Sequence, residues 1–295
     1  MKILLFRKKT IAVIFLITVV ALTTILFSTS IVNSAATNAS NRQLPIYRVD
    51  RKDNLASISF DAAWGNEDTQ QIIDILAKYD VKATFFVVGE WVDKYPESVL
   101  ALHNAGHEIM NHSDTHPHMT QLSADDMIKQ VEDCSSKIEK ITGVKPNLFR
   151  PPYGDYNDSV ISTLKNAGYY TIQWDVDSLD WKELSAEQIT KRVLDKTQPG
   201  SIVLFHNAAL HTPEALPMIL ESLKAKDIQL VKISELIYYE NYNIDHTGQQ
   251  YIVTSPESDD TQGTFSEENA DSSDAANLEE SAVTRDIRRQ VTLLE

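Results

Sequence analysis

The sequence contains a single cysteine, Cys134, among its 295 residues. A framework of disulfide bonds within the chain is therefore excluded, and the fold must be stabilised by its hydrophobic core. Positive charge is also scarce, because 27 Lys and Arg residues stand against 42 Asp and Glu residues and give a formal net charge of -15. Binding to nucleic acid relies on clustered Lys and Arg, so we do not expect a nucleic-acid partner.

Charged residues are missing from one long apolar stretch near the N-terminus. Residues 10–32 carry no charge, follow a basic segment at residues 1–9, and precede small residues at positions 34–36. This pattern predicts that residues 1–36 are either a cleaved signal peptide or a retained membrane anchor. Both interpretations place the rest of the chain outside the cytoplasmic membrane, secreted or anchored to it.

Basic residues are also absent from residues 256–280, a stretch that holds nine acidic residues and is rich in Ser and Asn. Such a composition cannot bury enough apolar surface to offset the entropy lost on ordering. We therefore expect a linker at residues 37–53, a globular domain at residues 54–243 and an acidic, largely disordered tail at residues 244–295.

Within the expected domain, apolar runs of strand character alternate with amphipathic helical patterns. The expected strands are Leu55–Phe60, Lys82–Val88, His107–Asn111, Asn147–Arg150, Tyr169–Trp174, Ser201–Phe205 and Ile228–Val231. The expected helices are Glu67–Tyr79, Pro96–Ala105, Ala124–Thr142 (with Ser123 as its N-cap), Ser159–Ala167, Ala186–Asp195 and Thr212–Lys224. This alternation predicts an α/β fold with a parallel sheet, either open and doubly wound or closed into a barrel.

Polar side chains stand at the ends of these strands. They are Asp61 after the first strand, His112 after the third, Arg150 at the end of the fourth, Asp175 and Asp177 after the fifth, and His206 after the sixth. Active sites of parallel α/β folds lie at the carboxyl ends of the strands. We therefore expect these side chains to converge on one mouth.

The segment Asn111–Met119 (NHSDTHPHM) contains two histidines four residues apart, His112 and His116. On a helical turn both imidazoles would point the same way, and neutral imidazole is a common ligand of zinc and other divalent ions. The spacing alone is a weak signal, but its place directly after a strand favours a metal site. We expect His118 on the surface and His107 in a structural role.

Three further segments place reactive groups after strands. RPPYG (residues 150–154) ends a strand with a guanidinium, which can pair with a carboxylate and hold it ionised. WDVDSLDW (residues 174–181) combines three carboxylates with two tryptophans, which is unusual for a solvated acidic loop. IVLFHN (residues 202–207) brings His206 out of a buried strand, where it is either a general acid or a hydrogen-bonded core histidine.

The ordered motifs FD, HSxxH, RPPYG, DSLDW and LFH, over residues 57–206, resemble those of the polysaccharide deacetylases, the NodB-homology domain of carbohydrate esterase family four. The similarity extends from about Asn54 to Ile237. It implies a distorted (β/α) barrel with fewer than eight strands and a metal-dependent hydrolase that removes acetyl groups from N-acetylated sugars. It also implies the sporulation-associated branch, in which a secreted or membrane-tethered domain acts on the peptidoglycan of the cell wall.

The resemblance assigns roles to the matching residues. The catalytic set is Asp61 as base, Arg150 orienting that base, His206 as general acid and Asp180 tuning the acid. The substrate-binding set is Tyr153, through a backbone N–H to the oxyanion, with Trp181 and Leu204 walling the acetyl pocket. The metal ligands are His112 and His116. In the implied mechanism the metal polarises the amide carbonyl and a water, the base takes the proton of that water, and the acid protonates the leaving amine.

One position departs from the family pattern. In the family a second aspartate follows the catalytic base and is the third metal ligand, whereas this chain has Ala62. Two histidines alone hold a divalent ion weakly, because catalytic zinc sites use three protein ligands. Three outcomes are open: Glu67 or Asp68 supplies the missing oxygen, Asp61 becomes a ligand, or metal and activity are lost.

The sequence therefore predicts an extracytoplasmic, monomeric N-deacetylase of peptidoglycan or a related amino-sugar polymer, with a divalent ion such as Zn²⁺, Co²⁺ or Mn²⁺. The alternative is a catalytically silent glycan-binding protein that keeps the cleft and its aromatic residues. A barrel of the amidohydrolase type acting on small molecules fits the order of the motifs less well. Ala62 separates the first two hypotheses, because it decides whether the site holds metal.

Overall fold

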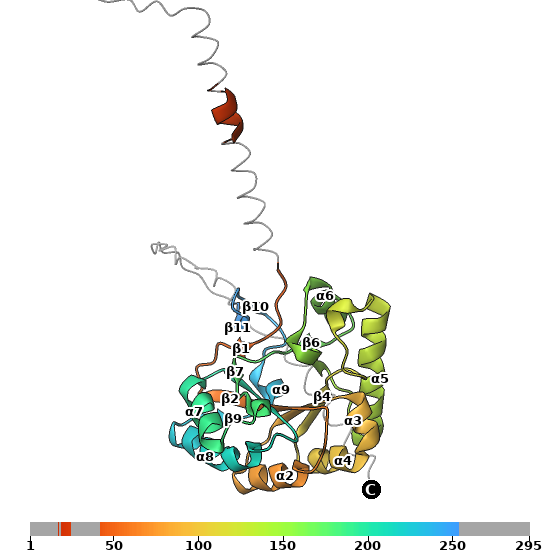
Figure 1. Ribbon diagram of the computed structural model, residues 1–295, viewed down its shortest axis with the longest axis vertical. Helices are drawn as coiled ribbons and strands as arrows, with labels where there is room; N and C mark the ends of the chain where they lie inside the picture. The colour runs from red at the N-terminus through yellow and green to blue at the C-terminus, as the bar shows by residue number, and fades with distance from the viewer. Residues whose placement is uncertain (1–16, 18, 25–41, 254–295) are drawn as a thin grey trace, which may run out of the picture. The chain divides into compact units, whose positions relative to one another are not determined.

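The computed structural model describes residues 17, 19–24 and 42–253 (Figure 1). Residues 17 and 19–24 are helical, and among the described residues no helix is both long and apolar enough to cross a membrane. Most of the predicted signal peptide or anchor lies outside the described residues, as does the acidic tail beyond residue 253. The α/β fold is carried by residues 42–253.

Strands and helices alternate along these residues, as the sequence patterns predict. The strands are β1 (Arg48–Val49), β2 (Leu55–Ala62), β3 (Thr84–Val87), β4 (Glu108–Asn111), β5 (Leu148–Phe149), β6 (Tyr170–Thr171), β7 (Val176–Asp177), β8 (Ile202–His206), β9 (Gln229–Leu230), β10 (Tyr242–Ile244) and β11 (Gln249–Ile252). The helices are α2 (Thr69–Lys78), α3 (Gly89–Lys94), α4 (Pro96–Asn104), α5 (Ala124–Thr142), α6 (Asp158–Asn166), α7 (Ala186–Lys196), α8 (Thr212–Ala225) and α9 (Ile233–Leu236). Short 3₁₀ turns cover Met119–Gln121, Pro152–Gly154 and Asp180–Lys182.

The main sheet is parallel and follows the order β6-β5-β4-β3-β2-β8-β7, with β9 pairing beside the start of β2. Strands β6 and β7 end this path. The N-terminal segment bridges them, because Ile46 pairs with Ile172 after β6 and Arg48 pairs with Ser201 before β8. A curled parallel path of fewer than eight strands confirms the expected distorted (β/α) barrel.

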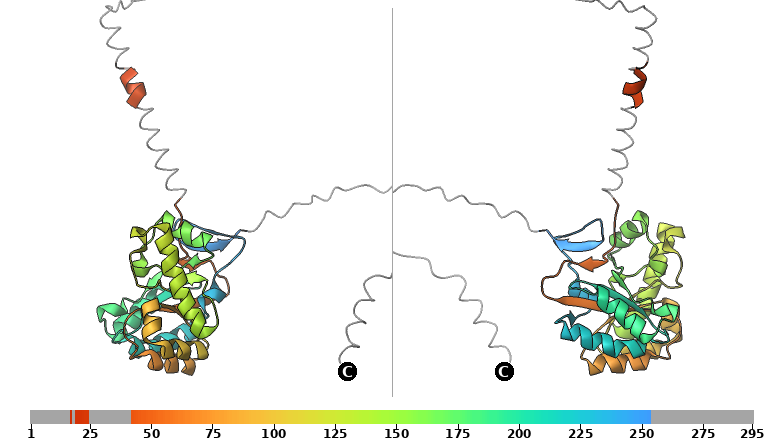
Figure 2. Two further views of the ribbon diagram at one scale, coloured as in Figure 1. Left: turned by 90° about the vertical axis from the view of Figure 1, so that its right-hand side faces the viewer. Right: turned by 60° about the vertical axis from the view of Figure 1, so that its left-hand side comes forward.

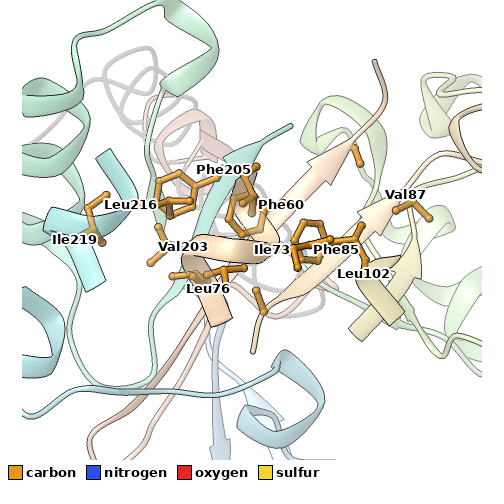
Figure 3. Packing of buried hydrophobic residues seen from close by; sticks show 14 of the residues in the cluster. Phe60, Ile73, Leu76, Phe85, Val87, Leu102, Val203, Phe205, Leu216 and Ile219 are labelled. Atoms are coloured by element: carbon orange, nitrogen blue, oxygen red, sulfur yellow. The ribbon is translucent and has the colours of Figure 1, made fainter. Parts of the chain in front are cut away.

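The hydrophobic core lies between the sheet and the surrounding helices, which pack pairwise as α7 with α8, α8 with α2, α2 with α4 and α4 with α5 (Figures 1 and 2). Strand β2 is buried almost throughout. Its Phe60 stacks on Phe85 at 4.8 Å and on Phe205 at 5.5 Å between ring centroids, as Figure 3 shows. Successive side chains of a strand point to opposite faces, so Ser59 and Asp61 face away from this cluster.

Helix α5 shows how closely local signals can fix an element. Ser123 Oγ accepts a hydrogen bond from the backbone N–H of Asp126 at 3.2 Å, which caps the first turn. Gly143 ends the helix in the left-handed conformation (φ 74°), where a residue without Cβ is favoured. The predicted bounds of this helix are confirmed.

Strands extend past the predicted domain limits at both ends. The expected linker contains β1, and the expected tail begins inside β10 and contains β11. Strand β11 pairs with β1 in parallel and with β10 in antiparallel orientation, forming a small second sheet (Figure 2). These strands span two to four residues, which is too short for a hydrophobic period to be visible in the sequence.

Candidate active site

A buried ion pair joins the ends of β2 and β5. The Arg150 guanidinium donates from Nη1 to Asp61 Oδ1 at 2.7 Å, and from Nη2 to Ser59 Oγ at 2.9 Å. The guanidinium also lies over the ring of Phe86, 4.1 Å from its centroid. Burial alone would raise the pKa of Asp61, but the neighbouring Arg150 charge outweighs it and holds that pKa below the usual range. Asp61 is therefore a carboxylate at neutral pH.

A second buried carboxylate holds His206 at the end of β8. Asp180 Oδ1 lies 2.8 Å from His206 Nδ1, and its Oδ2 accepts from the His206 backbone N–H at 2.8 Å. Thr212 Oγ1 donates to the same Oδ2 at 2.7 Å. Burial opposes the charged imidazole, but the hydrogen bond and charge of Asp180 prevail and raise the pKa of His206. With Nδ1 directed at the carboxylate, Nε2 is left to exchange a proton.

The two groups stand side by side. Asp61 and His206 are Cα partners in the parallel pairing of β2 and β8, so their side chains share one face of the sheet. The backbone N–H of Asn207 donates to the Asp61 carbonyl at 3.1 Å and continues the pairing beyond His206. An ionised carboxylate and a histidine with a raised pKa therefore face the same space, as the sequence predicts.

The two candidate metal ligands come together, but not on a helix. Strand β4 ends at Asn111, and the next residues form a loop in which Ser113 (φ 70°) and His116 (φ 58°) are left-handed. The rings of His112 and His116 lie 5.0 Å apart. The two rings therefore approach through a turn and not along a helix, because Asn111 Oδ1 accepts from the Ser113 N–H and Ser113 Oγ accepts from the His116 N–H.

Both imidazoles are suited to bind a cation. His112 is buried, and its Nδ1 lies 2.7 Å from the Arg150 carbonyl, to which it donates, so Nε2 keeps a lone pair. That Nε2 stands 3.6 Å from Asp61 Oδ2. Burial lowers the pKa of His112, and burial with the nearby His112 lowers the pKa of His116 to about 4. Both rings are neutral at pH 7.

Exposed aromatic side chains surround His116. The Trp64 ring meets His116 edge-on at 5.4 Å, and the Tyr153 ring does so at 4.5 Å. Tyr153 also stacks on His118 at 4.3 Å. Trp64, Tyr153 and Trp181 are 65%, 61% and 57% exposed, respectively, which is unusual for such large apolar groups.

The loop that carries Trp64 is held rigidly. The side-chain N–H₂ of Asn207 donates to the carbonyls of Trp64 and Gly65, and its Oδ1 accepts from the Ala63 N–H at 3.2 Å. Trp91 Nε1 donates to the same two carbonyls. The exposure of Trp64 is therefore built into the backbone.

Several sequence predictions for the site need correction. Asp175 does not lie at the mouth, because it accepts hydrogen bonds from Ser201 Oγ and the Ile202 N–H at the start of β8, the opposite end from His206. The residues after β6 return to that end before β7 begins at Val176, a two-residue strand that the sequence pattern did not indicate. Asp177 lies within β7 rather than after a strand.

His107 and His118 have the burial expected of a structural and a surface residue, and Leu204 lies near His206. Leu204 is buried on the same face of β8 as His206, two residues before it. His107 is buried, and its Nδ1 accepts from the Ala83 N–H at 3.2 Å. His118 is half exposed and pairs with Asp155 Oδ2 at 3.2 Å.

Trp64, Asn207, Thr212 and Ser59 are site residues that the sequence reasoning missed. The first two had a signal, because Trp64 stands three residues after Asp61 of the FD motif and Asn207 follows His206. The other two reach the site only through the fold.

Comparison with known proteins identifies the family. The sequence profile described as polysaccharide deacetylase matches residues 48–172. A peptidoglycan-N-acetylglucosamine deacetylase of Bacillus cereus is 34% identical over 66% of this chain and 93% of its own length. The chain belongs to the polysaccharide deacetylase family. Its deacetylase motifs, Asp61 with Arg150 and Asp180 with His206, form the two buried pairs of the site.

Two further similarities bear on activity. The peptidoglycan-N-acetylmuramic acid deacetylase PdaC of Bacillus subtilis is 38% identical over 64% of this chain, which spans only 40% of that relative's length. A solved structure of a family-four (CE4) pseudoenzyme from Bacillus anthracis is 38% identical, with a TM-score of 0.63 over 65% of this chain and 68% of its own. A mutant of that pseudoenzyme is described as having restored enzymatic activity.

Members of this family generally use a divalent metal. A three-ligand centre does not fit the residues of this chain, because the described part contains no group of three His, Cys, Asp or Glu side chains placed to hold an ion. Asp68 Oδ2 accepts from the Ala208 N–H at 2.9 Å, while its buried Oδ1 has no hydrogen-bond partner among the described residues. Among the described residues, neither Glu67 nor Asp68 forms a three-ligand group with His112 and His116.

Proposed function

We propose that this protein removes N-acetyl groups from amino sugars of peptidoglycan or a related polysaccharide. The observation that carries the proposal is the adjacent placement of a carboxylate kept ionised by Arg150 and a histidine whose pKa is raised by Asp180. Amide hydrolysis needs both, since a base must activate water and an acid must protonate the amine that leaves.

In the proposed hydrolysis, Asp61 and His206 carry the two proton transfers. Asp61 Oδ2 accepts a proton as water attacks the carbonyl carbon of the acetamide. The C–N bond breaks, the nitrogen takes the proton carried by His206 Nε2, and acetate and a free amine are the products. Arg150 keeps Asp61 ionised and oriented, and Asp180 fixes the imidazole so that Nε2 faces the same space as Asp61.

The exposed aromatic rings supply a surface for the polymer. A pyranose ring has apolar C–H faces that pack on aromatic rings, and Trp64 and Tyr153 present such rings on either side of His116. Trp181 follows Asp180 directly and its backbone N–H donates to Asp180 Oδ1 at 2.9 Å. We assign Trp64, Tyr153 and Trp181 to sugar binding, with Leu204 as the apolar floor beside His206.

The chain offers two histidine ligands for a divalent ion, where catalytic zinc sites use three protein ligands. His112 and His116 are neutral and adjacent, and in the proposal they take up Zn²⁺, Co²⁺ or Mn²⁺ weakly because Ala62 contributes no oxygen. Both rings would supply nitrogen ligands, and the ion would stabilise negative charge on the substrate oxygen.

Silent glycan binding is the second candidate function. It is favoured by the lack of a three-ligand metal set in the described residues and by the 38% identity to a structure described as a pseudoenzyme. Acetate release by the full chain from N-acetylglucosamine oligomers and from peptidoglycan fragments, with mass analysis of the products, decides between the two. Binding of the oligomers without any acetate, with or without added metal, would leave the second function standing.

We also propose that the protein works outside the cytoplasmic membrane, as a monomer, secreted or tethered through residues 1–36. The basic and then apolar pattern of that segment supports this location, and peptidoglycan lies on that side of the membrane. A role in sporulation belongs to the same proposal. Membrane fractionation of the expressed full chain, followed by protease treatment of intact cells, tests the location.

A further inference from the structure

A pocket of about 630 Å³ lies where segments far apart in the sequence meet, and we call it the seam pocket. Its lining comes from β1 and the residue before it, from the residues between β6 and β7, from the end of α7 and Gln198 after it, and from the β10–β11 hairpin. The views in Figure 2 show β1 beside that hairpin. The catalytic residues do not line it, and its Asp175 binds the start of β8, opposite to His206.

Two aromatic side chains form walls of the seam pocket. Tyr47 is fixed through its hydroxyl, which lies 3.0 Å from the hydroxyl of Tyr156, and their rings meet edge-on. Trp174 is fixed because the Arg150 guanidinium lies over its ring, 5.6 Å from the centroid. The pocket therefore presents aromatic surface whose orientation is set by contacts outside the pocket.

The polar lining of the seam pocket includes two positively charged side chains, Arg48 and Lys196. Arg48 donates from Nη2 to the Pro199 carbonyl at 3.1 Å, while its buried Nε has no hydrogen-bond partner among the described residues. Lys196 is exposed and forms no ion pair within the described part of the chain. The Asp175 carboxylate accepts hydrogen bonds from Ser201 Oγ and the Ile202 N–H, and its charge offsets only one of the two positive charges, those of Arg48 and Lys196. In a chain with a net charge of -15, this local excess of positively charged donors favours an anionic ligand.

The walls are held close together by two glycines. A Cβ added at Gly248 would stand 2.2 Å from Tyr47 Cδ2, and one added at Gly200 would stand 1.7 Å from the Val49 carbonyl oxygen. Both glycines have positive φ, 85° and 84° respectively. The hairpin turn and the loop before β8 can therefore approach β1 only because these positions lack side chains, and the pocket exists before any ligand arrives.

We propose that the seam pocket binds a sugar residue that carries a carboxylate. The ring packs against Tyr47 and Trp174, and the carboxylate pairs with Arg48 and Lys196. The side-chain amides of Gln198 and Gln249, which also line the pocket, reach the ring hydroxyls. A volume of about 630 Å³ falls in the range typical of small-molecule sites and accommodates one sugar with its substituent.

This site goes beyond the proposed deacetylation and does not depend on it. A neutral acetamido sugar bound at Asp61 and His206 and an acidic sugar bound in the seam pocket are separate ligands. Trp174 connects the two sites, because it lines the pocket and the Arg150 guanidinium lies over its ring. An acidic polymer would thus be held at a second point while its neutral residues reach the catalytic pair.

The test uses the full chain and NMR titration with sodium glucuronate, N-acetylmuramic acid, methyl glucoside and inorganic phosphate. The variant is Lys196→Glu. The matched control is Lys224→Glu, because each lysine is the basic residue in the last turn of its helix and Lys224 lies outside the pocket. The two acidic sugars are expected to bind, methyl glucoside much more weakly. Lys196→Glu should weaken both by about five- to tenfold while Lys224→Glu leaves them unchanged.

Two further measurements distinguish failure of the seam-pocket proposal from failure of the proposed function. Asp61→Asn should bind the acidic sugars as the unmodified protein does, and Lys196→Glu should release acetate from neutral oligomers at the unmodified rate. Loss of acetate release in every protein with acidic-sugar binding intact would refute the deacetylase alone. Equal weakening by both lysine variants, no binding of either acidic sugar, or full competition by inorganic phosphate would overturn the seam-pocket proposal.

Discussion

Arg150 and Asp61 form an ion pair in which Nη1 stands 2.7 Å from Oδ1 and neither side chain is more than 8% exposed. Both charged groups are buried away from water, so each charge is stabilised mainly by the other. Such pairs add little net stability, but removal of one partner leaves a buried uncompensated charge and costs about 3–5 kcal/mol. The pair is therefore better explained by what it does to Asp61 than by what it adds to the fold.

Asp61→Asn is expected to lower the rate of acetate release by about two to four orders of magnitude, because an amide cannot take the proton of the water. Asn retains an oxygen that accepts from Arg150, so circular dichroism should show a folded protein with a reduced melting temperature. Asp74→Asn, an exposed change on α2, is the control for rate and stability. Acetate release near the unmodified rate in Asp61→Asn would show that another group is the base.

Arg150→Met is expected to shift the acidic limb of the pH–rate profile to higher pH. Asp61 acts as a base only when ionised, so activity falls as pH drops through its pKa, and the Arg150 charge holds that pKa low. Without the charge, burial raises the pKa and activity is lost sooner on acidification. The profile of kcat/KM against pH measures this shift. Arg150→Lys, which keeps the charge, should move the limb less, and an unmoved limb in both variants contradicts the assignment.

Asp180→Asn is expected to shift the alkaline limb of the profile of kcat/KM against pH. His206 must be protonated to act as the acid, so activity falls as pH rises through its pKa, which Asp180 raises. Removing the carboxylate charge lowers that pKa, and the alkaline limb should move to lower pH while the acidic limb stays in place. Thr212→Val removes one hydrogen bond to Asp180 and leaves its charge in place, so it should move the alkaline limb far less than Asp180→Asn does.

Much of the site was predictable because motifs fall at strand ends. Asp61, Arg150 and His206 each end a buried apolar run, and parallel strands bring their carboxyl ends together. Helix α5 was predictable to its terminal residues because both of its caps are local. What a residue meets across the barrel, such as Ser59 with Arg150, depends on the pairing of distant strands and has no local signature.

The errors also have physical causes. His112 and His116 approach in a loop with two left-handed residues, which local hydrogen bonds to the side chains of Asn111 and Ser113 stabilise, and not on the helical turn that a four-residue spacing would align. Asp175 was misplaced because β7 has two residues, too few for any pattern, and the chain returns to the start of β8 before it begins. Strand β1 was taken for linker for the same reason of length.

Trp64→Ala is expected to raise KM for oligomers by about tenfold with a smaller change in kcat. A ring exposed on a rigid loop contributes to binding the ground state and the transition state alike, and loss of such uniform binding raises KM. Trp64→Phe should recover most of the affinity, which a purely structural role would also allow. Titration of Asp61→Asn carrying Trp64→Ala separates the two, because binding is then read without turnover. Unchanged affinity would remove Trp64 from the sugar surface.

Ala62→Asp is the substitution that decides how the site uses metal. It is expected to tighten binding of Zn²⁺, Co²⁺ or Mn²⁺ by at least about tenfold, because a third ligand need add only about 1.4 kcal/mol for that gain. Acetate release at a fixed metal concentration should rise in parallel and vanish with chelator. Calorimetry and activity measured on the same metal titration check both.

The backbone makes this change costly without metal. Ala62 is buried in the apolar cluster that includes Phe60, and its carbonyl accepts from the Val88 N–H, so strand alternation directs its Cβ away from the face that Asp61 occupies. A carboxylate there must turn around the end of β2 to meet His112. Until it does so it is a buried unpaired polar group, which costs about 1–3 kcal/mol.

The cost of the buried carboxylate and the gain from metal binding both change the melting temperature of Ala62→Asp. Metal-free Ala62→Asp should melt below the unmodified protein and recover on metal addition, since an ion that binds only the folded state stabilises it. Ala62→Asn is the matched control, because it has the same shape but is a weaker ligand without charge, and it should lose stability with little recovery. If both variants melt equally low and neither takes up metal or gains activity, the carboxylate stays in the core. In that case His112 and His116 are not two-thirds of a metal site that position 62 can complete.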